Sequence, residues 1–286
     1  MKFVSFTAAG WASYGVAHER GIFDLGVRLG DIVPDLKTYI EARERGLLAP
    51  LPSTSAADYR FDEITYDPVI PLPGKIICVG LNYEEHRVET GRPESSYPSL
   101  FTRFADTLIG HRAPIIRPRV STALDYEGEL AVVIGREGFR VPRDKALDIV
   151  AGYACFNEGT LRDWQRHTHQ FTPGKNFPNT GAFGPELVTP DEISRFDDLK
   201  IETRLNGTVM QSAQLGDMIF SVPHIIEYVS AFTPLSPGDV IATGTPGGVG
   251  FKREPPLYMK PGDVVEVTIE SVGHLVNDVR DESDFA

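Results

Sequence analysis

The sequence contains little cysteine and no long hydrophobic run. Its 286 residues include only two cysteines, Cys78 and Cys155, and both lie in apolar segments. This placement predicts reduced thiols packed in the core, and it gives no support to a disulfide or a cysteine-ligated metal site. No apolar run approaches the length of a membrane span, and the N-terminal MKFVSF lacks the hydrophobic region of a signal peptide. We therefore expect a cytoplasmic protein with no membrane partner.

Positive charge is also scarce. Lys and Arg total 28 against 40 Asp and Glu, which gives a formal net charge of −12. A balance of this sign argues against general nucleic-acid binding and against attraction to anionic membranes. It also means that an anionic substrate would need a local cation at its binding site.

Three common catalytic or nucleotide-binding motifs are missing. The glycine-rich segment TGTPGGVG at residues 243–250 lacks the Gly-Lys-Ser/Thr ending of a P-loop and the glycine spacing of a dinucleotide site. The sequence also contains no Gly-x-Ser-x-Gly nucleophile elbow. We therefore reject nucleotide binding at this loop, and the missing nucleophile elbow argues against a serine hydrolase.

The remaining patterns predict a β-rich α+β fold in two parts. Residues 1 to about 48 combine three alternating segments with an amphipathic helix over 35–46, and residues 49–73 form a linker with one short strand. We divide the chain into a small N-terminal domain with its linker at 1–70 and a main domain at 71–286. Strands outnumber helices and come in hairpins, which favours α+β over a doubly wound fold.

The main domain shows a succession of expected elements. Asn206-Gly207 is the strongest hairpin signal and predicts a turn between strands within 202–211. Asn82 is placed to cap a short helix over 83–89. We expect further strands at 75–80, 121–135, 152–156, 239–244 and 263–270, and helices at 142–152 and 221–232.

Two carboxylates lie inside the strand expected at 121–135. Alternation places Leu130, Val132 and Ile134 on one face, with Glu127 and Glu129 on the other, roughly 7 Å apart at the Cα atoms. Two ionised carboxylates on an apolar strand repel each other and lose hydration, and a divalent cation between them would offset both penalties. The alternative is a strand with one solvated face that carries two surface glutamates. These residues alone leave both interpretations open.

A third carboxylate, Glu158, follows the buried strand expected at 152–156. The end of an apolar strand is a place where residues bind ligands in a cleft, although many such carboxylates only cap a turn. Together with Glu127 and Glu129 it would form an all-oxygen set, which suits Mg²⁺ or Mn²⁺ and suits Zn²⁺ poorly. The prediction depends on the three side chains meeting in space.

Two further segments carry residues that can move protons or bind anions. His86 and Glu89 are three residues apart on the helix expected at 83–89, so Glu89 could orient His86 and raise its basicity. Lys175 follows a glycine and is well placed to meet an anion, while Arg162 and Gln165 come shortly after Glu158. Taken singly, a histidine, lysine or arginine in such a position is more often a solvated surface residue.

Taken together, these segments resemble the fumarylacetoacetate hydrolase superfamily. The matching segments, in order, are ICVGLNYEEHRVE, DYEGELAVVIG, GYACFNEGTLRDWQ, GKNF, MIFSVPHIIEYVS and GDVIATGTPGGVG, and they cover roughly residues 73–270. Their joint occurrence in this order is far more specific than any one of them. The resemblance implies a β-rich mixed-sheet roll preceded by the small β/α N-terminal domain of many bacterial members. It also implies a homodimer and a requirement for Mg²⁺ or Mn²⁺.

The resemblance further implies a role for each candidate residue. The positions of the metal ligands are matched by Glu127, Glu129 and Glu158. The catalytic positions, including a dyad on a lid over the substrate, are matched by His86, Glu89 and Lys175. The substrate-contacting positions are matched by Arg162, Gln165, Gly244 and Thr245.

One departure from the superfamily pattern concerns the third ligand, which is commonly Asp and here is Glu158. The added methylene still allows the carboxylate to reach a metal, but it shifts the ion or changes how the carboxylate binds. Leu161 stands where the superfamily usually has Ala before Arg-Asp, which alters packing more than chemistry.

The implied activity is a divalent-metal-dependent hydrolase that cleaves a C–C bond in a 2,4-dioxo acid of the acylpyruvate or fumarylpyruvate type. His86 would remove a proton from water, Lys175 and Gln165 would stabilise the oxyanion at C4, and a metal-bound pyruvate enolate would leave. The alternatives are an oxaloacetate decarboxylase, a hydroxymuconate-type diacid isomerase or decarboxylase, and an inactive metal-binding protein. Candidates for binding a distal carboxylate of the substrate are Arg87, Arg92, Arg103 and Arg166.

Overall fold

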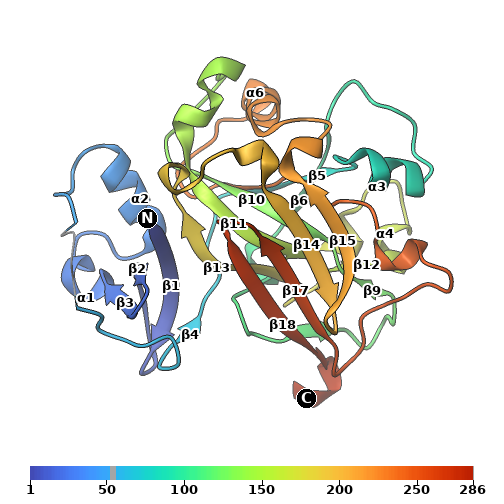
Figure 1. Cartoon of the computed structure of the whole chain (residues 1–286), viewed down its shortest axis with the longest axis horizontal. Coiled ribbons are helices and arrows are strands. Elements are labelled where there is room, and N and C mark those ends of the chain that lie inside the picture. Colours follow the sequence, from blue (N-terminus) through green and yellow to red (C-terminus); the bar gives the residue numbers. More distant parts are fainter. Residues whose placement is uncertain (52–55, 286) are drawn as a thin grey trace.

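The computed structural model describes residues 1–51 and 56–285, and its largest unit is a sheet of eleven strands (Figure 1). These strands are β1 Lys2–Ala8, β2 Trp11–His18, β3 Gly21–Asp24, β4 Thr65–Tyr66, β5 Ile76–Gly80, β6 Ser99–Arg103, β7 Leu108–Ile109, β10 Gly128–Ile134, β11 Val150–Glu158, β13 Gly181–Val188 and β16 Val240–Ala242. The main path has the order β3-β2-β1-β13-β11-β10-β16-β5-β6, with β4 paired to β1 and β7 paired to β13. Most neighbours are antiparallel, but β16 pairs with β5 and β7 with β13 in parallel. The sheet is therefore mixed.

A second sheet of five strands lies against one face of the first. Its order is β15-β14-β17-β18-β8, and a separate pair joins β9 to β12. The bounds are β8 Ile115–Arg117, β9 Leu124–Asp125, β12 Thr160–Leu161, β14 Lys200–Leu205, β15 Thr208–Gln214, β17 Val264–Ile269 and β18 Gly273–Asp281. Buried side chains of β10 and β11 pack with those of β14, β17 and β18 in one hydrophobic cluster. The fold is the predicted β-rich α+β arrangement.

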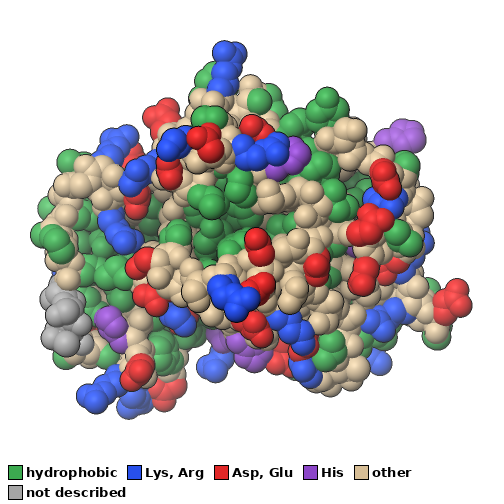
Figure 2. Space-filling view, turned by 45° about the horizontal axis from the view of Figure 1, so that its top comes forward, with side chains coloured by type: hydrophobic (Ala, Val, Ile, Leu, Met, Phe, Trp, Pro, Cys, Tyr) green, Lys and Arg blue, Asp and Glu red, His purple; other side chains and the backbone are tan. Residues whose placement is uncertain are grey.

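The helices are short and lie around the sheets. They are α1 Gly26–Leu29, α2 Leu36–Glu44, α3 Glu84–Glu89, α4 Arg162–Gln165, α5 Thr172–Lys175 and α6 Val222–Phe232, with 3₁₀ turns η1 Ala105–Thr107, η2 Arg143–Ile149, η3 Pro190–Glu192, η4 Phe196–Asp198, η5 Leu215–Asp217, η6 Gly250–Lys252 and η7 Glu282–Phe285. Within the described ranges, no helix is both long enough and apolar enough to cross a membrane. Figure 2 shows Lys and Arg side chains intermixed with Asp and Glu over one face of the molecule. The acidic net charge is therefore not gathered into a single patch on that face.

Strand β10 is buried on both faces along its whole length. Leu130, Val132 and Ile134 belong to the core beneath the second sheet, and Ala131 and Val133 belong to the core on the other side. The predicted alternation is thus confirmed, and the interpretation of a strand with one solvated face is wrong. A strand covered on both faces takes almost entirely apolar residues, which makes the acidic residues at its start exceptional.

The N-terminal strands β1–β3 and helix α2 lie together at one end of the molecule (Figure 1). Asp35 caps α2, because its side chain accepts a hydrogen bond from the Thr38 backbone N–H at 2.7 Å. Strand β1 pairs with β13 from the main part of the chain, through Lys2 and Phe3. The small N-terminal unit therefore continues the large sheet. Residues 52–55 of the predicted linker lie outside the described residues.

Several local predictions can be compared directly with the structure. The hairpin is confirmed, and Asn206 and Gly207 both have positive φ, at +52° and +77°, as its two-residue turn requires. The strand expected at 121–135 is divided into β9 and β10, and the helix expected at 142–152 is the 3₁₀ segment η2. The predicted cap at Asn82 is wrong, because Tyr83 is the N-cap residue of α3. The Asn82 amide instead donates to the carbonyls of Phe220 and Thr243, at 3.0 and 2.7 Å.

Candidate metal centre and active site

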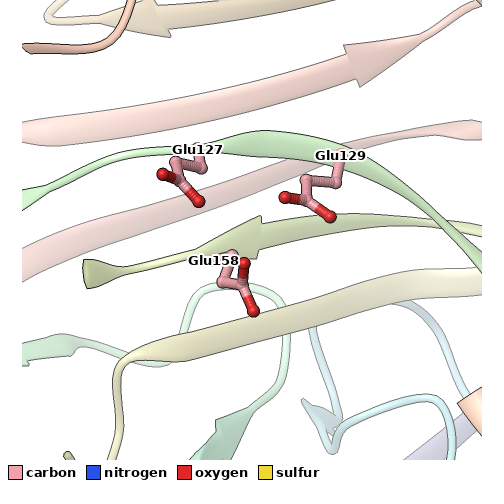
Figure 3. Close-up of side chains that lie close together, drawn as sticks. All are labelled: Glu127, Glu129 and Glu158. Carbon is pink, nitrogen blue, oxygen red and sulfur yellow. The ribbon is translucent and has the colours of Figure 1, made fainter. Parts of the chain in front are cut away.

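Three buried carboxylates meet at adjacent ends of strands β10 and β11. Glu127 and Glu129 extend from the same side of one strand segment, and Glu158 comes from the neighbouring strand (Figure 3). One carboxylate oxygen from each residue lies within 4.8 Å of the others. Glu127, Glu129 and Glu158 are buried, with 4%, 2% and 1% of their surface exposed to solvent. The meeting in space on which the sequence prediction depended is therefore present.

Basic side chains surround this carboxylate cluster. Lys175, at the end of α5, donates from Nζ to Glu127 Oε2 at 2.5 Å and to Glu158 Oε2 at 2.9 Å. Arg162, the first residue of α4, donates from Nε to Asp125 Oδ2 at 2.8 Å. Its Nη2 forms an ion pair with Glu127 Oε1 at 2.7 Å. Glu127 thus has a cation on each side.

The fixed positive charges decide which carboxylate stays ionised. Burial is the largest influence on Glu127 and acts to raise its pKa, but Arg162 and Lys175 together outweigh it and lower the pKa to about 2. For Glu129, burial and then repulsion from Glu158 and Glu127 raise the pKa well above the ordinary value. Burial acts to lower the pKa of Lys175, yet Glu127 and Glu158 outweigh it and the pKa is raised. Of Glu127 and Glu129, Glu129 is therefore the carboxylate whose ionised form is stabilised less by the protein alone.

Glu129 is positioned by the glycine-rich loop that follows β16. Its Oε2 accepts a hydrogen bond from the Gly244 backbone N–H at 2.9 Å. Gly244 has φ +100°, and a Cβ there would lie 2.7 Å from Cβ of Asn82 and 2.8 Å from the Val79 carbonyl oxygen. Only glycine allows the loop to pass this close to Val79 and Asn82 while its N–H reaches the Glu129 carboxylate.

The cluster fits a divalent cation. It offers three carboxylate oxygens, and within the described part of the chain Glu158 Oε1 is buried without a hydrogen-bond partner. Carboxylate oxygens are the ligands that Mg²⁺ and Mn²⁺ prefer. Such an ion would stabilise the ionised form of Glu129, which the protein alone disfavours. Glu127 and Glu158 would then bind the cation and also accept hydrogen bonds from Lys175.

The predicted catalytic dyad is formed on α3. His86 Nδ1 lies 2.7 Å from Glu89 Oε1, and Glu89 Oε2 accepts from the Gly248 backbone N–H at 3.0 Å. With the carboxylate held at both oxygens, a proton on Nδ1 would point at Glu89 and leave Nε2 as the basic nitrogen. The helix therefore presents an oriented imidazole.

A cavity of about 460 Å³ brings these groups together. It is lined by the three glutamates and by the predicted residues His86, Arg162, Gln165, Lys175 and Thr245. Gln165 Oε1 accepts from Arg162 Nη1 at 3.0 Å, and Thr245 Oγ1 donates to the Gly128 carbonyl at 2.9 Å. Glu89 and Gly244 do not line the cavity. They orient two residues that do, because Glu89 contacts His86 and the Gly244 N–H donates to Glu129. The predicted residues thus converge on one cleft.

The four arginines considered for a distal carboxylate differ in where they lie. Arg92 and Arg166 line the cavity. Arg87 does not line it and instead pairs with Glu84 at 2.5 Å. Arg103 is buried and donates to the Gly159 carbonyl and to Thr180, with Nη1 3.8 Å from Glu158 Oε1. Arg87 and Arg103 therefore do not serve the role that the sequence suggested for them.

Sequence reasoning missed two residues that organise the site. Asp125, fully buried, accepts from Arg162 and from the backbone N–H groups of Gly250 and Phe251 at 2.9 and 3.0 Å. The Phe251 ring lies under the Arg162 guanidinium, 4.3 Å from its centroid. The one available signal was the acidic residue of Leu124-Asp125-Tyr126, two positions before Glu127. The hydrogen bond between Asp125 and Phe251 joins positions 126 residues apart, which local patterns do not predict.

Known proteins resemble this chain over nearly its whole length. The family model described as Fumarylacetoacetate (FAA) hydrolase C-terminal matches residues 75–280. The chain is 39% identical over 272 residues to oxaloacetate tautomerase YisK of Bacillus subtilis (strain 168), a match that covers 91% of this chain and 90% of that protein. It is 37% identical over 287 residues to the mitochondrial oxaloacetate tautomerase FAHD2A of Bos taurus, covering 98% and 91%.

Solved structures agree with this chain in fold. Fumarylacetoacetate hydrolase from psychrophilic Exiguobacterium antarcticum has a TM-score of 0.85 at 35% identity, covering 99% of this chain and 100% of that one. Maleylpyruvate hydrolase from Sphingobium sp. SYK-6, in complex with manganese(II) and pyruvate, has a TM-score of 0.78 at 27% identity, covering 98% and 99%. The resemblance first indicated by the ordered segments is confirmed. This chain belongs to the fumarylacetoacetate hydrolase family of enzymes.

Proposed function

We propose that the protein is a divalent-metal-dependent tautomerase that interconverts the enol and keto forms of a short 2-oxo diacid of the oxaloacetate type. One observation carries the proposal: the three buried carboxylates and the carboxylate-oriented His86 open into the same cavity. Oxaloacetate tautomerases that match over at least nine-tenths of both chains also support it. These relatives favour the alternatives, an oxaloacetate decarboxylase or a hydroxymuconate-type diacid isomerase or decarboxylase, over the C–C hydrolysis that the resemblance first suggested. The tautomerase proposed here keeps the oxaloacetate of the first alternative and the isomerisation of the second.

Glu127, Glu129 and Glu158 would hold the cation in this proposal. When bound, a divalent cation stabilises the negative charge that develops on the oxygen at C2 of a 2-oxo acid. We propose Mg²⁺ or Mn²⁺, and the manganese complex of maleylpyruvate hydrolase supports the second ion as a candidate.

His86 would carry the proton. Tautomerisation to the keto form removes the hydroxyl proton of the enol and adds a proton at C3, with no water consumed. An imidazolium at His86 gives its Nε2 proton to C3 and then takes the hydroxyl proton, so the residue ends as it began. Glu89 orients the ring through the 2.7 Å contact with Nδ1, so that Nε2 faces the substrate.

The surroundings of Lys175 support proton transfer over hydrolysis. Hydrolysis of a 2,4-dioxo acid needs a donor directed at the oxyanion that forms on C4. Lys175 and Gln165 were the expected donors, and of these Lys175 donates from Nζ to Glu127 and Glu158 in the carboxylate cluster. Tautomerisation needs no donor at C4, so the observed placement of Lys175 is sufficient for it.

The test measures three reactions on one preparation. Protein loaded with Mg²⁺ or Mn²⁺ is given oxaloacetate, and the loss of enol absorbance in the ultraviolet is followed together with pyruvate formation. An acylpyruvate is assayed in parallel for C–C cleavage. We expect enol loss above the spontaneous rate and faster than either pyruvate-forming reaction. Faster cleavage of the acylpyruvate would favour hydrolysis, and faster pyruvate formation from oxaloacetate would favour decarboxylation.

The variant His86→Asn tests the proton carrier. We expect the tautomerisation rate to fall by about 10²–10⁴-fold, the usual contribution of a positioned acid–base group, with metal affinity unchanged. The matched control is His18→Asn, which removes an exposed histidine at the end of β2 and should leave the rate unchanged. Retention of most activity by His86→Asn at saturating metal would show that another group carries the proton.

A further inference from the structure

The buried part of the cavity has a nearly balanced charge. Four buried carboxylates, from Asp125, Glu127, Glu129 and Glu158, lie with three buried cations. These cations are Arg103, Arg162 and Lys175, all in contact with members of the cluster. A bound divalent cation would change the sum from one negative to one positive charge. The carboxylate next to C2 of a 2-oxo acid would neutralise that charge, so a second carboxylate on the substrate has no unmatched cation there.

The cavity has two further cations toward its exposed side, Arg92 and Arg166. Both residues line the cavity and are exposed. Neither forms an ion pair with an acidic side chain within residues 1–51 and 56–285. They differ in this respect from Arg87, which is occupied by Glu84, and from Arg162, which is occupied by Asp125 and Glu127.

Arg166 differs from Arg92 because an aromatic ring holds it in place. Its guanidinium carbon lies 4.6 Å from the centroid of the Phe251 ring, and that of Arg162 lies 4.3 Å from the same centroid. The ring is itself anchored, since the Phe251 N–H donates to Asp125 Oδ2 at 3.0 Å. A guanidinium stacked on an aromatic face loses less freedom when it binds a carboxylate, and its N–H edge remains available. Arg166 is therefore oriented by Phe251, and it has no acidic partner among the described residues.

We propose that Arg166 binds the second carboxylate of the substrate and makes the site selective for 2-oxo diacids over 2-oxo monoacids. The inference rests on the proposed function, and it names the specificity-determining residue of that site. The cluster end of the cavity accepts the 2-oxo acid group, and Arg166 meets the carboxylate at the other end of the molecule. The Phe251 ring contacts both arginines, of which Arg162 is committed to Asp125 and Glu127 and Arg166 is open to substrate.

The test uses two ligands that differ only in the distal group. Malate and 2-hydroxybutanoate have the same chain length, with a carboxylate in the first where the second has a methyl group. Calorimetry on the Mn²⁺-loaded protein gives both dissociation constants. We expect Arg166→Met to weaken malate binding about tenfold or more, the usual effect of losing charge-assisted hydrogen bonds, and to leave 2-hydroxybutanoate within twofold. Arg166→Lys, which retains the charge without the planar fork, should fall between the wild type and Arg166→Met.

Lys252→Met is the matched control. Lys252 Nζ also lies near the Phe251 ring, 5.6 Å from its centroid, but Lys252 does not line the cavity. Removing this charge should leave both dissociation constants unchanged. Equal weakening by Lys252→Met and Arg166→Met would reduce the effect to general electrostatics and would overturn the assignment.

Two outcomes would overturn the inference directly. One is a wild-type protein that binds malate no more tightly than 2-hydroxybutanoate, and the other is an Arg166→Met variant that retains the wild-type preference. Kinetics separate this failure from failure of the proposed function. If the wild type tautomerises oxaloacetate but Arg166→Met leaves its KM unchanged, Arg166 is not the specificity residue and the function stands. If the wild type has no tautomerase activity but Arg166→Met binds malate more weakly than the wild type does, the proposed function fails and the assignment of Arg166 stands.

Discussion

The two ends of strand β10 are buried to the same degree but are stabilised in different ways. At one end Val132, Val133 and Ile134 are 0% exposed and pack between two hydrophobic cores. At the other end Glu129, and Glu127 just before the strand begins, are 2% and 4% exposed and face charged neighbours. The apolar end is stabilised by the removal of hydrocarbon from water, whereas each buried carboxylate loses hydration and needs a counter-charge. Glu127 has two counter-charges, whereas Glu129 is repelled by Glu127 and Glu158. The acidic end therefore favours cation binding but lowers the stability of the metal-free fold.

The largest expected effect comes from Glu129→Gln, which changes the acidic end alone. Gln retains an oxygen that can accept the Gly244 N–H, but it removes the carboxylate with the strongly raised pKa. We expect affinity for Mn²⁺ to fall by about 10³-fold or more, beyond the 10–100-fold typical of outer-shell changes. Because a carboxyl group with a raised pKa in the folded state costs stability at pH values above its ordinary pKa, we expect the metal-free variant to be more stable than the metal-free wild type at pH 7. Manganese titration and chemical unfolding measure the two quantities.

A metal-free variant that is less stable than the wild type would contradict the proposed cost of Glu129. The wild type can be compared with and without metal, because saturating metal should restore the free energy of unfolding that the acidic end costs. At a metal concentration of 100 times Kd, binding adds about 2.7 kcal/mol to the free energy of unfolding. Chelation should remove this gain from the wild type and change Glu129→Gln little.

Leu130→Ala changes the apolar part of the strand and leaves the carboxylates in place, one residue after Glu129. Leu130 is fully buried in the core beneath the second sheet. Loss of its side chain should lower the free energy of unfolding by about 3 kcal/mol, within the range for buried leucines that leave a cavity. Its main-chain carbonyl, which accepts from Thr243, is retained, so Mn²⁺ affinity should stay within about twofold. A large loss of metal affinity in Leu130→Ala would show that the two ends of the strand are not independent.

His111 gives a smaller effect and tests the same rule on a titratable group buried without an acidic partner. Burial first, and then Arg112 and His274, lower the pKa of His111 from 6.5 to about 4. A histidine with a lowered pKa is neutral in the folded state, so its contribution is present above pH 6.5 and is lost as the pH falls toward 4. Between pH 7 and pH 4.5 the wild type should lose about 2–3 kcal/mol from this residue.

The variant His111→Gln isolates that contribution. Gln can replace Nδ1 as the acceptor of the Val276 N–H, which lies 3.1 Å from it in the wild type. Chemical unfolding at pH 7 and pH 4.5 should show a smaller loss for the variant than for the wild type. Equal losses in the two proteins would mean that His111 titrates normally in the folded state.

Local sequence patterns predicted those parts of the fold that depend on neighbours along the chain. The Asn206-Gly207 turn followed from residues that tolerate positive φ, and the two-residue alternation of β10 followed from strand geometry. Asn82 shows where such reasoning fails. Its local setting is that of a helix cap, but its amide binds carbonyls 138 and 161 residues away. Which partner a polar side chain takes in the interior depends on what the fold places beside it.

The sequence by itself determined the types of groups at the site: three carboxylates for an oxygen-ligated cation, and a histidine and glutamate at helical spacing. These follow from residue chemistry and short-range geometry. Only the tertiary structure decided that Glu158 meets the other two, that Lys175 joins them, and that Arg166 remains unpaired on Phe251 while Arg103 is buried. Charges of buried groups depend on distances between segments far apart in the chain, and those distances are fixed only when the sheet has formed.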